Sequence, residues 1–222
     1  GAEYVVVIAP NKGSVYPEYL PDSIAGYRGL SRYDKLMDFL EKRTDIHAVK
    51  VKKALLGAKH RFNQPLYEIN GTRWNDIGAF VAYEELGAVL TRLYPDYKPK
   101  TLSDFSIGKT NCVRDLERML NVAGYHTQAE PTLSCPDIPA TDFGITPAIA
   151  YTNMATRTGL LPKTIAFRDC FCARLGAYLA GDCRQLDTYT SLKFDPDLVA
   201  KEKPGLVIEE VAERYIDYLF GR

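Results

Sequence analysis

The stretch YVVVIA, residues 4–9, decides the fold class of this chain. It is continuous, apolar and rich in β-branched side chains, which is the pattern of a strand buried on both faces of a parallel sheet. The sequence PNKG at residues 10–13 ends it with turn-forming residues. Further short apolar runs then alternate with segments of helical periodicity, which predicts parallel strands joined by crossover helices.

The remaining elements are predicted from the same two periodicities. Further strands are expected at residues 45–51, 163–167, 185–190 and 206–208, with a strand end at 67–70. Helices are expected after the capping residue Ser31, with Leu30 as its first apolar position, and over residues 75–94, 113–122, 171–180, 195–202 and 211–220. Residues 96–111 are predicted to be loop, and about 124–162 a Pro-containing, loop-rich insertion with at most a short strand pair. We therefore predict one domain over residues 1–222, a three-layer α/β/α sandwich with a mainly parallel sheet.

Composition supports a folded domain and excludes several classes of partner. The chain has 222 residues, 46% of them hydrophobic and 25% charged, which is enough to bury a sizeable core. Its 28 basic and 28 acidic residues balance to a net charge of zero, so a nucleic-acid partner is not expected. The longest apolar run, residues 4–10, is too short for a membrane-spanning helix, and no transmembrane or targeting segment is predicted.

The cysteine pattern does not favour a metal site. The five cysteines are Cys112, Cys135, Cys170, Cys172 and Cys183. They form no CxxC pair, and no histidine stands at a metal-ligand spacing from them, so neither a metal nor another cofactor is expected. One or two disulfides are compatible with an oxidising compartment, and the sequence does not choose the pairing.

Candidate chemistry is expected where strands end and helices begin, because ligands of such sheets bind beyond the carboxyl ends of the strands. Three segments qualify: residues 11–13, 71–75 and 168–172. At a strand-to-helix turn, Cys170 would face helix N-terminal amides that favour a thiolate. The alternative is that Cys170 is a small buried hydrophobic residue. The three histidines, His47, His60 and His126, do not follow strand ends, so the sequence shows no obvious base.

A polar and aromatic cluster follows the first strand. It contains Asn11, Lys12, Tyr16 and Tyr19. Ring faces and hydrogen-bonding tips suit carbohydrate, so this cluster is a candidate sugar-binding lip. A Pro-rich turn with ordinary amphipathic tyrosines explains the same residues.

Four segments together resemble one family. IAPNKGSVYPEYLP at residues 8–21 resembles the PNKxxVYPEYLP segment of the alginate O-acetyltransferase AlgJ/AlgX family, whose domains are SGNH-hydrolase-like. GTRWNDIGA at 71–79 is similar to its DTHWNxxGA block, and RDCF at 168–171 to its RDSF nucleophile turn. The stretch from 203 to 215 resembles its closing KPDxVIEExVERYL segment. The four blocks occur in the family's order and span most of the chain.

The resemblance implies a periplasmic or other extracytoplasmic domain that moves acetyl groups to or from polysaccharide hydroxyls. The polysaccharide and other export or acetylation proteins are the implied partners. In the family the chemistry belongs to a serine and an Asp-x-His pair, and by position these fall on Cys170, Gly71 and Arg73. Substrate binding is expected from Asn11, Lys12, Tyr16, Trp74, Asn75 and Arg168.

All three catalytic positions depart from the family pattern. Arg73 cannot act as a general base, and Gly71 has no carboxylate to orient one. Loss of such groups lowers kcat by about 10⁴- to 10⁶-fold. A Cys170 thiolate, supported by the helix end and Arg73, could still accept an acyl group, but its release to a sugar hydroxyl would lack a proton acceptor.

Three hypotheses follow for the function of the chain. The first is acyl transfer through Cys170. The second is a non-catalytic polysaccharide-binding or scaffold domain, and the third is a redox role for Cys170 and Cys172. Gly205 also replaces an aspartate of the family, and family members carry an earlier stretch, so an N-terminal element of the domain is expected to be missing.

Overall fold

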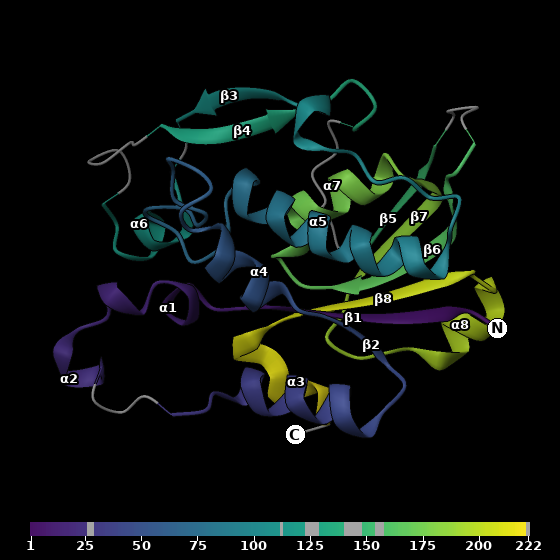
Figure 1. The fold of residues 1–222 in the computed structure, drawn as a ribbon, viewed down its shortest axis with the longest axis horizontal. Helices are drawn as coiled ribbons and strands as arrows, with labels where there is room; N and C mark the ends of the chain where they lie inside the picture. Colours follow the sequence, from purple (N-terminus) through teal and green to yellow (C-terminus); the bar gives the residue numbers. More distant parts are fainter. Residues whose placement is uncertain (26–28, 112, 123–128, 140–147, 154–157, 221–222) are drawn as a thin grey trace.

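The computed structural model describes residues 1–222 except 26–28, 112, 123–128, 140–147, 154–157 and 221–222 (Figure 1). Its centre is a six-stranded sheet of order β2-β1-β8-β6-β7-β5. The strands are β1 (Glu3–Ala9), β2 (His47–Val49), β5 (Ala148–Thr152), β6 (Leu161–Arg168), β7 (Cys183–Thr190) and β8 (Leu206–Ala212). Neighbouring strands are parallel except at the edge, where β5 pairs with β7 in the antiparallel sense. The predicted α/β fold class is confirmed.

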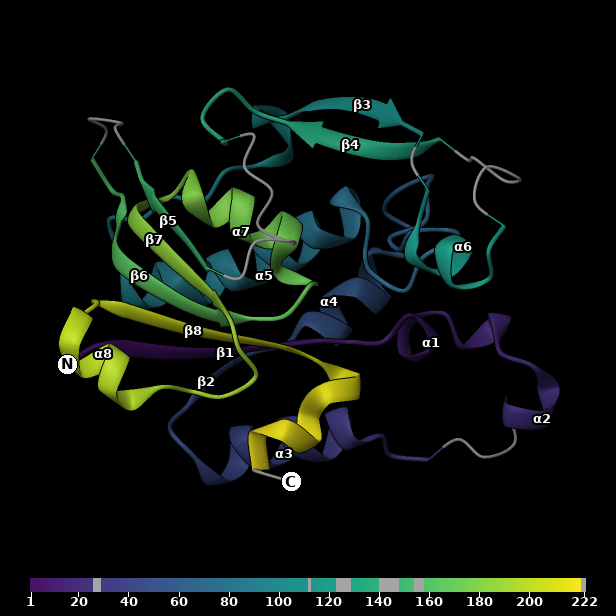
Figure 2. The same ribbon diagram turned by 180° about the vertical axis from the view of Figure 1, so that it is seen from behind.

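Helices cover both faces of this sheet, with α4, α5 and α7 on one side and α3, α8 and η3 on the other (Figures 1 and 2). Their bounds are α3 (Arg32–Arg43), α4 (Val51–Ala58), α5 (Asp76–Leu93), α7 (Cys172–Ala180), α8 (Pro196–Glu202) and the 3-10 helix η3 (Glu213–Phe220). Val5 and Val7 pack into the large core under α4, α5 and α7, whereas Val6 and Ile8 pack under α3 and η3. Strand β1 is therefore buried on both faces, as its sequence predicts.

Local capping explains where the two best-predicted helices begin. Ser31 caps α3 through a reciprocal capping box with Asp34, and the Asn75 side chain accepts a hydrogen bond from Gly78 N at 3.1 Å to start α5. Leu30 lies before α3 and is 75% exposed, so it is not part of the apolar face predicted for it.

Several predicted elements are wrong in extent or type. The strand expected over 45–51 is only three residues long, because Val51 already starts α4. Residues 67–70 form only an isolated bridge between Tyr67 and Trp74. Within the predicted loop 96–111 lie a 3-10 turn, η2 (Leu102–Asp104), and a strand, β3 (Ser106–Thr110). Strand β3 is largely exposed, so its sequence shows no alternation of apolar and polar residues.

The insertion contributes to two sheets. Strand β4 (Glu130–Ser134) pairs with β3 as a separate ribbon that lies above α5 and α7, and β5 adds to the main sheet (Figures 1 and 2). Helix α6 (Asp115–Met119) is shorter than predicted, and Gly124, its expected stop, lies outside the described residues. Near the C-terminus, β8 continues to Ala212, and η3 replaces the α-helix predicted from Val211, since β1 pairs with the strand along its full length.

Short elements complete the chain after β1. They are α1 (Lys12–Val15), η1 (Pro17–Tyr19) and α2 (Asp22–Ala25), at the end of the molecule to which β1 points (Figure 1). In the described part of the chain, every helix is too short or too polar to cross a bilayer.

Candidate active site

The carboxyl ends of three neighbouring strands are tied together by carboxylates. After β1, the backbone N–H of Asn11 donates to Glu213 Oε2 at 2.8 Å, and Glu213 directly follows β8. After β6, Asp169 Oδ2 accepts from the N–H of Ala212 at 2.7 Å. The strand-end segments at Asn11 and at Asp169 and Cys170 therefore adjoin the end of β8, as the sheet order requires.

The two turns of the predicted active site meet. The indole Nε1 of Trp74 donates a hydrogen bond to the carbonyl of Phe171 at 2.8 Å. The two rings pack edge to face with centroids 5.1 Å apart. Trp74 follows Arg73 and Phe171 follows Cys170, so the positions of the family's histidine and serine lie in one region of the molecule.

Lys12 holds the first of these turns in place. Its Nζ donates to the carbonyls of Glu68, Ile69 and Gly71 at 2.6, 2.8 and 3.2 Å. Burial lowers the pKa of Lys12, and nearby carboxylates, chiefly those of Glu130 and Glu68, oppose that shift. The structure thus gives Lys12 a positioning role that links β1 to the Gly71 turn.

Three of the residues expected to bind substrate are closed to solvent. Trp74, Asn75 and Arg168 are all buried. Trp74 packs on Phe171, and Asn75 caps α5 and donates to the carbonyl of Pro65 at 2.7 Å. The sequence interpretation is corrected on this point: a direct sugar contact is not available to these side chains in this structure, because the core needs them.

The environment of Cys170 favours the protonated thiol. Burial raises the pKa of this thiol, and Asp169 adds to the rise, while Arg73 and Arg214 oppose it. The guanidinium of Arg214 lies over the Phe171 ring at 5.1 Å. The thiolate expected from the helix end and Arg73 is therefore not favoured, because desolvation is the largest of these effects.

No base reaches the sulfur from the described residues. Cys170 has no hydrogen-bond partner there, and no histidine is among the groups that shift its pKa. His47, on β2, has its Nε2 3.7 Å from Oε2 of Glu3 on β1. His60 is exposed after α4, and His126 lies outside the described residues. Asp169, the neighbouring carboxylate, instead accepts from the N–H of Phe171 at 2.8 Å.

A carboxylate that the sequence analysis missed occupies the space beside Gly71. A Cβ atom on Gly71 would lie 2.1 Å from Oε2 of Glu68, whose residue is only 1% exposed. Oε1 of Glu68 is 3.1 Å from Arg114 Nη1 and 3.3 Å from Arg174 Nη1. Glu68 thus occupies the space that a side chain at position 71 would enter, and two arginines hold it there. Because Glu68 stands three residues before Gly71 in an irregular turn, no periodicity points to it.

An open cavity lies beside the Lys12 turn. It has a volume of about 660 Å³ and is lined by Lys12, Tyr16, Tyr19, Lys59, Phe62, Asn63, Gln64, Pro65, Tyr67 and Ile69. The rings of Tyr16 and Tyr19 stack at 5.9 Å, and Lys59 Nζ lies 4.7 Å from the Tyr16 ring centroid. Tyr19 is 77% exposed, so the stack ends in a ring face that is open to solvent. The predicted Tyr16 and Lys12 belong to this cavity, while Asn11 lies next to it in the chain.

The remaining cysteines offer no disulfide within the described residues. Cys135, Cys170, Cys172 and Cys183 are all free thiols, and Cys112 lies outside the described part of the chain. Cys172 is fully buried, and burial raises its pKa well above the usual range. In the described ranges, no three His, Cys, Asp or Glu side chains are grouped so that they could hold a metal ion.

The structure is thus an α/β domain in which the Gly71–Trp74 and Cys170 turns meet at the carboxyl edge of a mainly parallel sheet. A family profile described as "SGNH hydrolase-like domain, acetyltransferase AlgX" matches residues 1–142, more than half of the chain. The chain therefore belongs to that family. A search of curated proteins gives no match.

Solved structures share the fold at low sequence identity. Bacillus cereus PatB1, in a structure with a sulfonyl adduct, has a TM-score of 0.70 and 14% identity over 96% of this chain and 82% of its own. The O-acetyltransferase domain of Pseudomonas putida AlgJ has a TM-score of 0.56 and 19% identity, over 97% and 76%. Pseudomonas aeruginosa AlgX has a TM-score of 0.58 and 16% identity, over 95% and 52%.

Proposed function

We propose that this chain is a polysaccharide-binding domain of extracytoplasmic O-acetylation machinery in which catalysis is lost or greatly reduced. Membership of the AlgX family and the O-acetyltransferase domain of AlgJ among its structural neighbours support the setting. The substituted positions support the loss: a guanidinium at Arg73 cannot serve as a general base, Gly71 has no side chain, and burial raises the pKa of the Cys170 thiol.

The observation that carries the binding function is the tyrosine-lined cavity beside the Lys12 turn. Tyr16 and Tyr67 are buried and their hydroxyls bond to Leu66 N and to the carbonyl of Pro10, so the exposed ring of Tyr19 supplies the flat face that can stack on a sugar. Lys12 and Lys59 line the same wall, but the Nζ of Lys12 donates to three carbonyls and that of Lys59 donates to Val15 O and Glu18 Oε1, so the exposed ring face, and not a free ammonium group, carries the proposed sugar contact. The volume of about 660 Å³ is in the range of ligand sites and would hold a short stretch of a polymer chain.

Calorimetric titration with alginate oligosaccharides tests the binding function. We expect saturable binding that weakens by about tenfold in Tyr19→Ala, since an aromatic stack contributes on the order of 1 kcal/mol beyond its buried area. Phe39→Ala is the matched control. It removes an exposed ring of α3, which lies on the other face of the sheet, and should leave alginate binding unchanged. The absence of binding to both alginate and a neutral oligosaccharide contradicts the proposal.

A second candidate function, acyl transfer through Cys170, rests on the position of this residue at the β6–α7 turn. The Cys170 sulfur would then attack the acetyl carbonyl of an activated ester, the C–O bond would break, and the alcohol would leave with the thiol proton, so that a thioester remains on Cys170. Intact-mass measurement after incubation at neutral pH separates the two functions. We expect an unmodified chain, and a stable adduct that Cys170→Ala removes would support transfer instead.

A further inference from the structure

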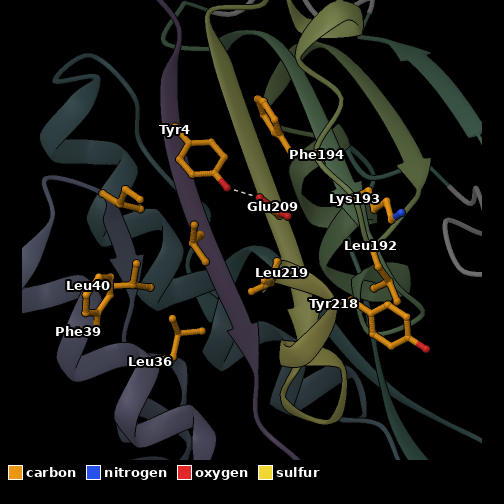
Figure 3. A pocket seen from close by; sticks show the side chains of 12 residues that line it. Tyr4, Leu36, Phe39, Leu40, Leu192, Lys193, Phe194, Glu209, Tyr218 and Leu219 are labelled. Carbon is orange, nitrogen blue, oxygen red and sulfur yellow. Dashed lines mark hydrogen bonds between the residues drawn. The ribbon is translucent and has the colours of Figure 1, made fainter. Parts of the chain in front are cut away.

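A second cavity lies on the other face of the sheet, the face that α3, α8 and η3 cover. It has a volume of about 720 Å³, and its floor is formed by side chains of β1 and β8. Helix α3 supplies one wall, while the segment after β7 and the end of η3 supply the other (Figure 3). This face carries two separate small core clusters, one under α3 and η3 and one under α8. The cavity is the gap between them.

Its walls are mainly apolar and aromatic. Phe39 comes from α3, Leu192 and Phe194 from the segment after β7, and Tyr218 from η3. The Phe194 ring packs edge to face on Tyr4 at 5.7 Å, which fixes one wall against the floor. A volume of this size with aromatic walls and few polar groups is typical of a small-molecule site.

One carboxyl group breaks this apolar surface. Glu209 of β8 is 5% exposed, and the hydroxyl of Tyr4 donates a hydrogen bond to its Oε2 (Figure 3). Burial raises the pKa of Glu209, and the Tyr4 hydrogen bond only partly opposes that rise. Among the described residues, no basic group contributes to this pKa, so the carboxyl is buried without a counter-charge.

Lys193, the cation nearest in the lining, does not supply that charge. It lines the same cavity but forms no ion pair with Glu209, and its ammonium points away from the carboxyl (Figure 3). A buried carboxylate without a cation is unfavourable in apolar surroundings. A cationic ligand with an apolar body would remove this penalty and cover the aromatic walls at the same time.

We propose that this cavity binds a small organic cation: an ammonium group that pairs with Glu209, carried on an aromatic or alkyl body that packs between Phe39, Leu192 and Phe194. The Tyr4 hydroxyl holds one oxygen of the carboxylate, which leaves the other for the ammonium. The site is separate from the Lys12 cavity and does not depend on the proposed polysaccharide function.

Three probes of one shape and different charge test the proposal by NMR titration of the labelled chain. The probes are phenethylamine, 2-phenylethanol and phenylacetate. We expect phenethylamine to shift amide signals of β1, β8 and α3 with a Kd of about 1 mM, a usual affinity for so small a ligand. Phenylethanol should bind at least about tenfold more weakly, because it lacks the charge-assisted contact. Equal binding of phenylacetate overturns the proposal.

Glu209→Gln keeps the shape of the side chain and removes its charge. We expect it to weaken phenethylamine binding by about tenfold and to leave phenylethanol unchanged. Glu84→Gln on α5, on the other face of the sheet, is the matched control and should bind as the parent does. Phe194→Ala, which shortens one wall, should weaken both ligands. Unchanged phenethylamine binding in Glu209→Gln contradicts the proposal, as does a concentration-dependent dimer whose contact shifts map to this cavity.

Discussion

Glu68 and Glu209 are two buried carboxyl groups in opposite situations. Glu68 lies beside the family's catalytic position and is paired with Arg114 and Arg174. Glu209 lies in an apolar cavity and has the Tyr4 hydroxyl as its partner. Burial raises the pKa of both groups, and at Glu68 the arginines oppose the rise. The carboxyl group beside Gly71 is therefore held by two arginines, whereas the carboxyl group on the other face has a hydroxyl partner but no cation among the described residues.

Substitution of Glu68 should have the largest effect. Glu68→Gln removes one of the two carboxylates that face each of Arg114 and Arg174, which keep Glu130 and Asp76 respectively, so we expect a loss of about 2 to 3 kcal/mol in the free energy of unfolding. Urea denaturation measures it. Glu209→Gln is the matched control, and it should be neutral or stabilising because Glu209 has no cation to leave behind. Equal losses in the two variants would remove the distinction between the two carboxyl groups.

Restoration of the family's aspartate should fail for steric reasons. Gly71→Asp places a Cβ 2.1 Å from Glu68 Oε2, so we expect a loss of about 2 kcal/mol of stability. Combining it with Glu68→Gly removes the collision with both Oε2 and Cβ of residue 68 and returns a carboxylate to the arginines. A double-mutant cycle from urea denaturation should then show the pair to be more stable than the sum of the single changes. Additive losses would mean that Glu68 does not occupy the aspartate's space.

The pH dependence of stability should separate Glu209 from its glutamine variant. Its folded pKa lies above the ordinary value of 4.5, so the folded state binds a proton more tightly than the unfolded state. The stability from this proton is complete below 4.5 and is lost as the pH rises through the folded pKa. The free energy of unfolding of Glu209→Gln should therefore rise relative to that of the parent chain as the pH increases from 4.5 through the folded pKa. Urea midpoints at several pH values measure the difference, and a constant difference would contradict the raised pKa.

The smallest effect is expected at Cys170. Its thiol is protonated at neutral pH, so alkylation by iodoacetamide should be slow and should accelerate only as the pH rises. Arg214→Ala removes a cation that opposes the rise in pKa, and should slow the reaction by less than about threefold, because Arg214 is exposed. Peptide mapping assigns the label to Cys170. Fast labelling near pH 6 would restore the thiolate interpretation.

The sheet was predictable because its strands are local, continuous and apolar. The apolar composition of YVVVIA at 4–9 and of the run that ends at Arg168 predicts that these strands are buried. The capping residues Ser31 and Asn75 predict where helices begin. Strand β3 was not predictable, since it is exposed and pairs with a strand some twenty residues later. Strand β5 becomes a strand by adding to the edge of the main sheet, a long-range contact that its own sequence does not show.

Some features of the candidate site were also predictable from the sequence, and others were not. The meeting of the Gly71–Trp74 and Cys170 turns followed from motif order and from the rule for parallel sheets. The burial of Trp74, Asn75 and Arg168 did not, because side-chain exposure at a turn depends on what packs over it. Glu68 and Glu209 were both missed for a related reason. A carboxyl group in the sequence predicts solvent exposure, and only the fold shows which of them is enclosed.

One NMR titration with acetylated alginate oligosaccharides tests the central claim, that this domain binds polysaccharide without acting on its acetyl groups. Signals of residues around Tyr19 and Lys59 report binding, and the acetyl methyl signal of the same sample reports chemistry. We predict saturable shifts of the cavity residues with the acetyl signal intact over the whole titration. An acetyl signal that decays in the parent chain and stays constant in Cys170→Ala would contradict the account.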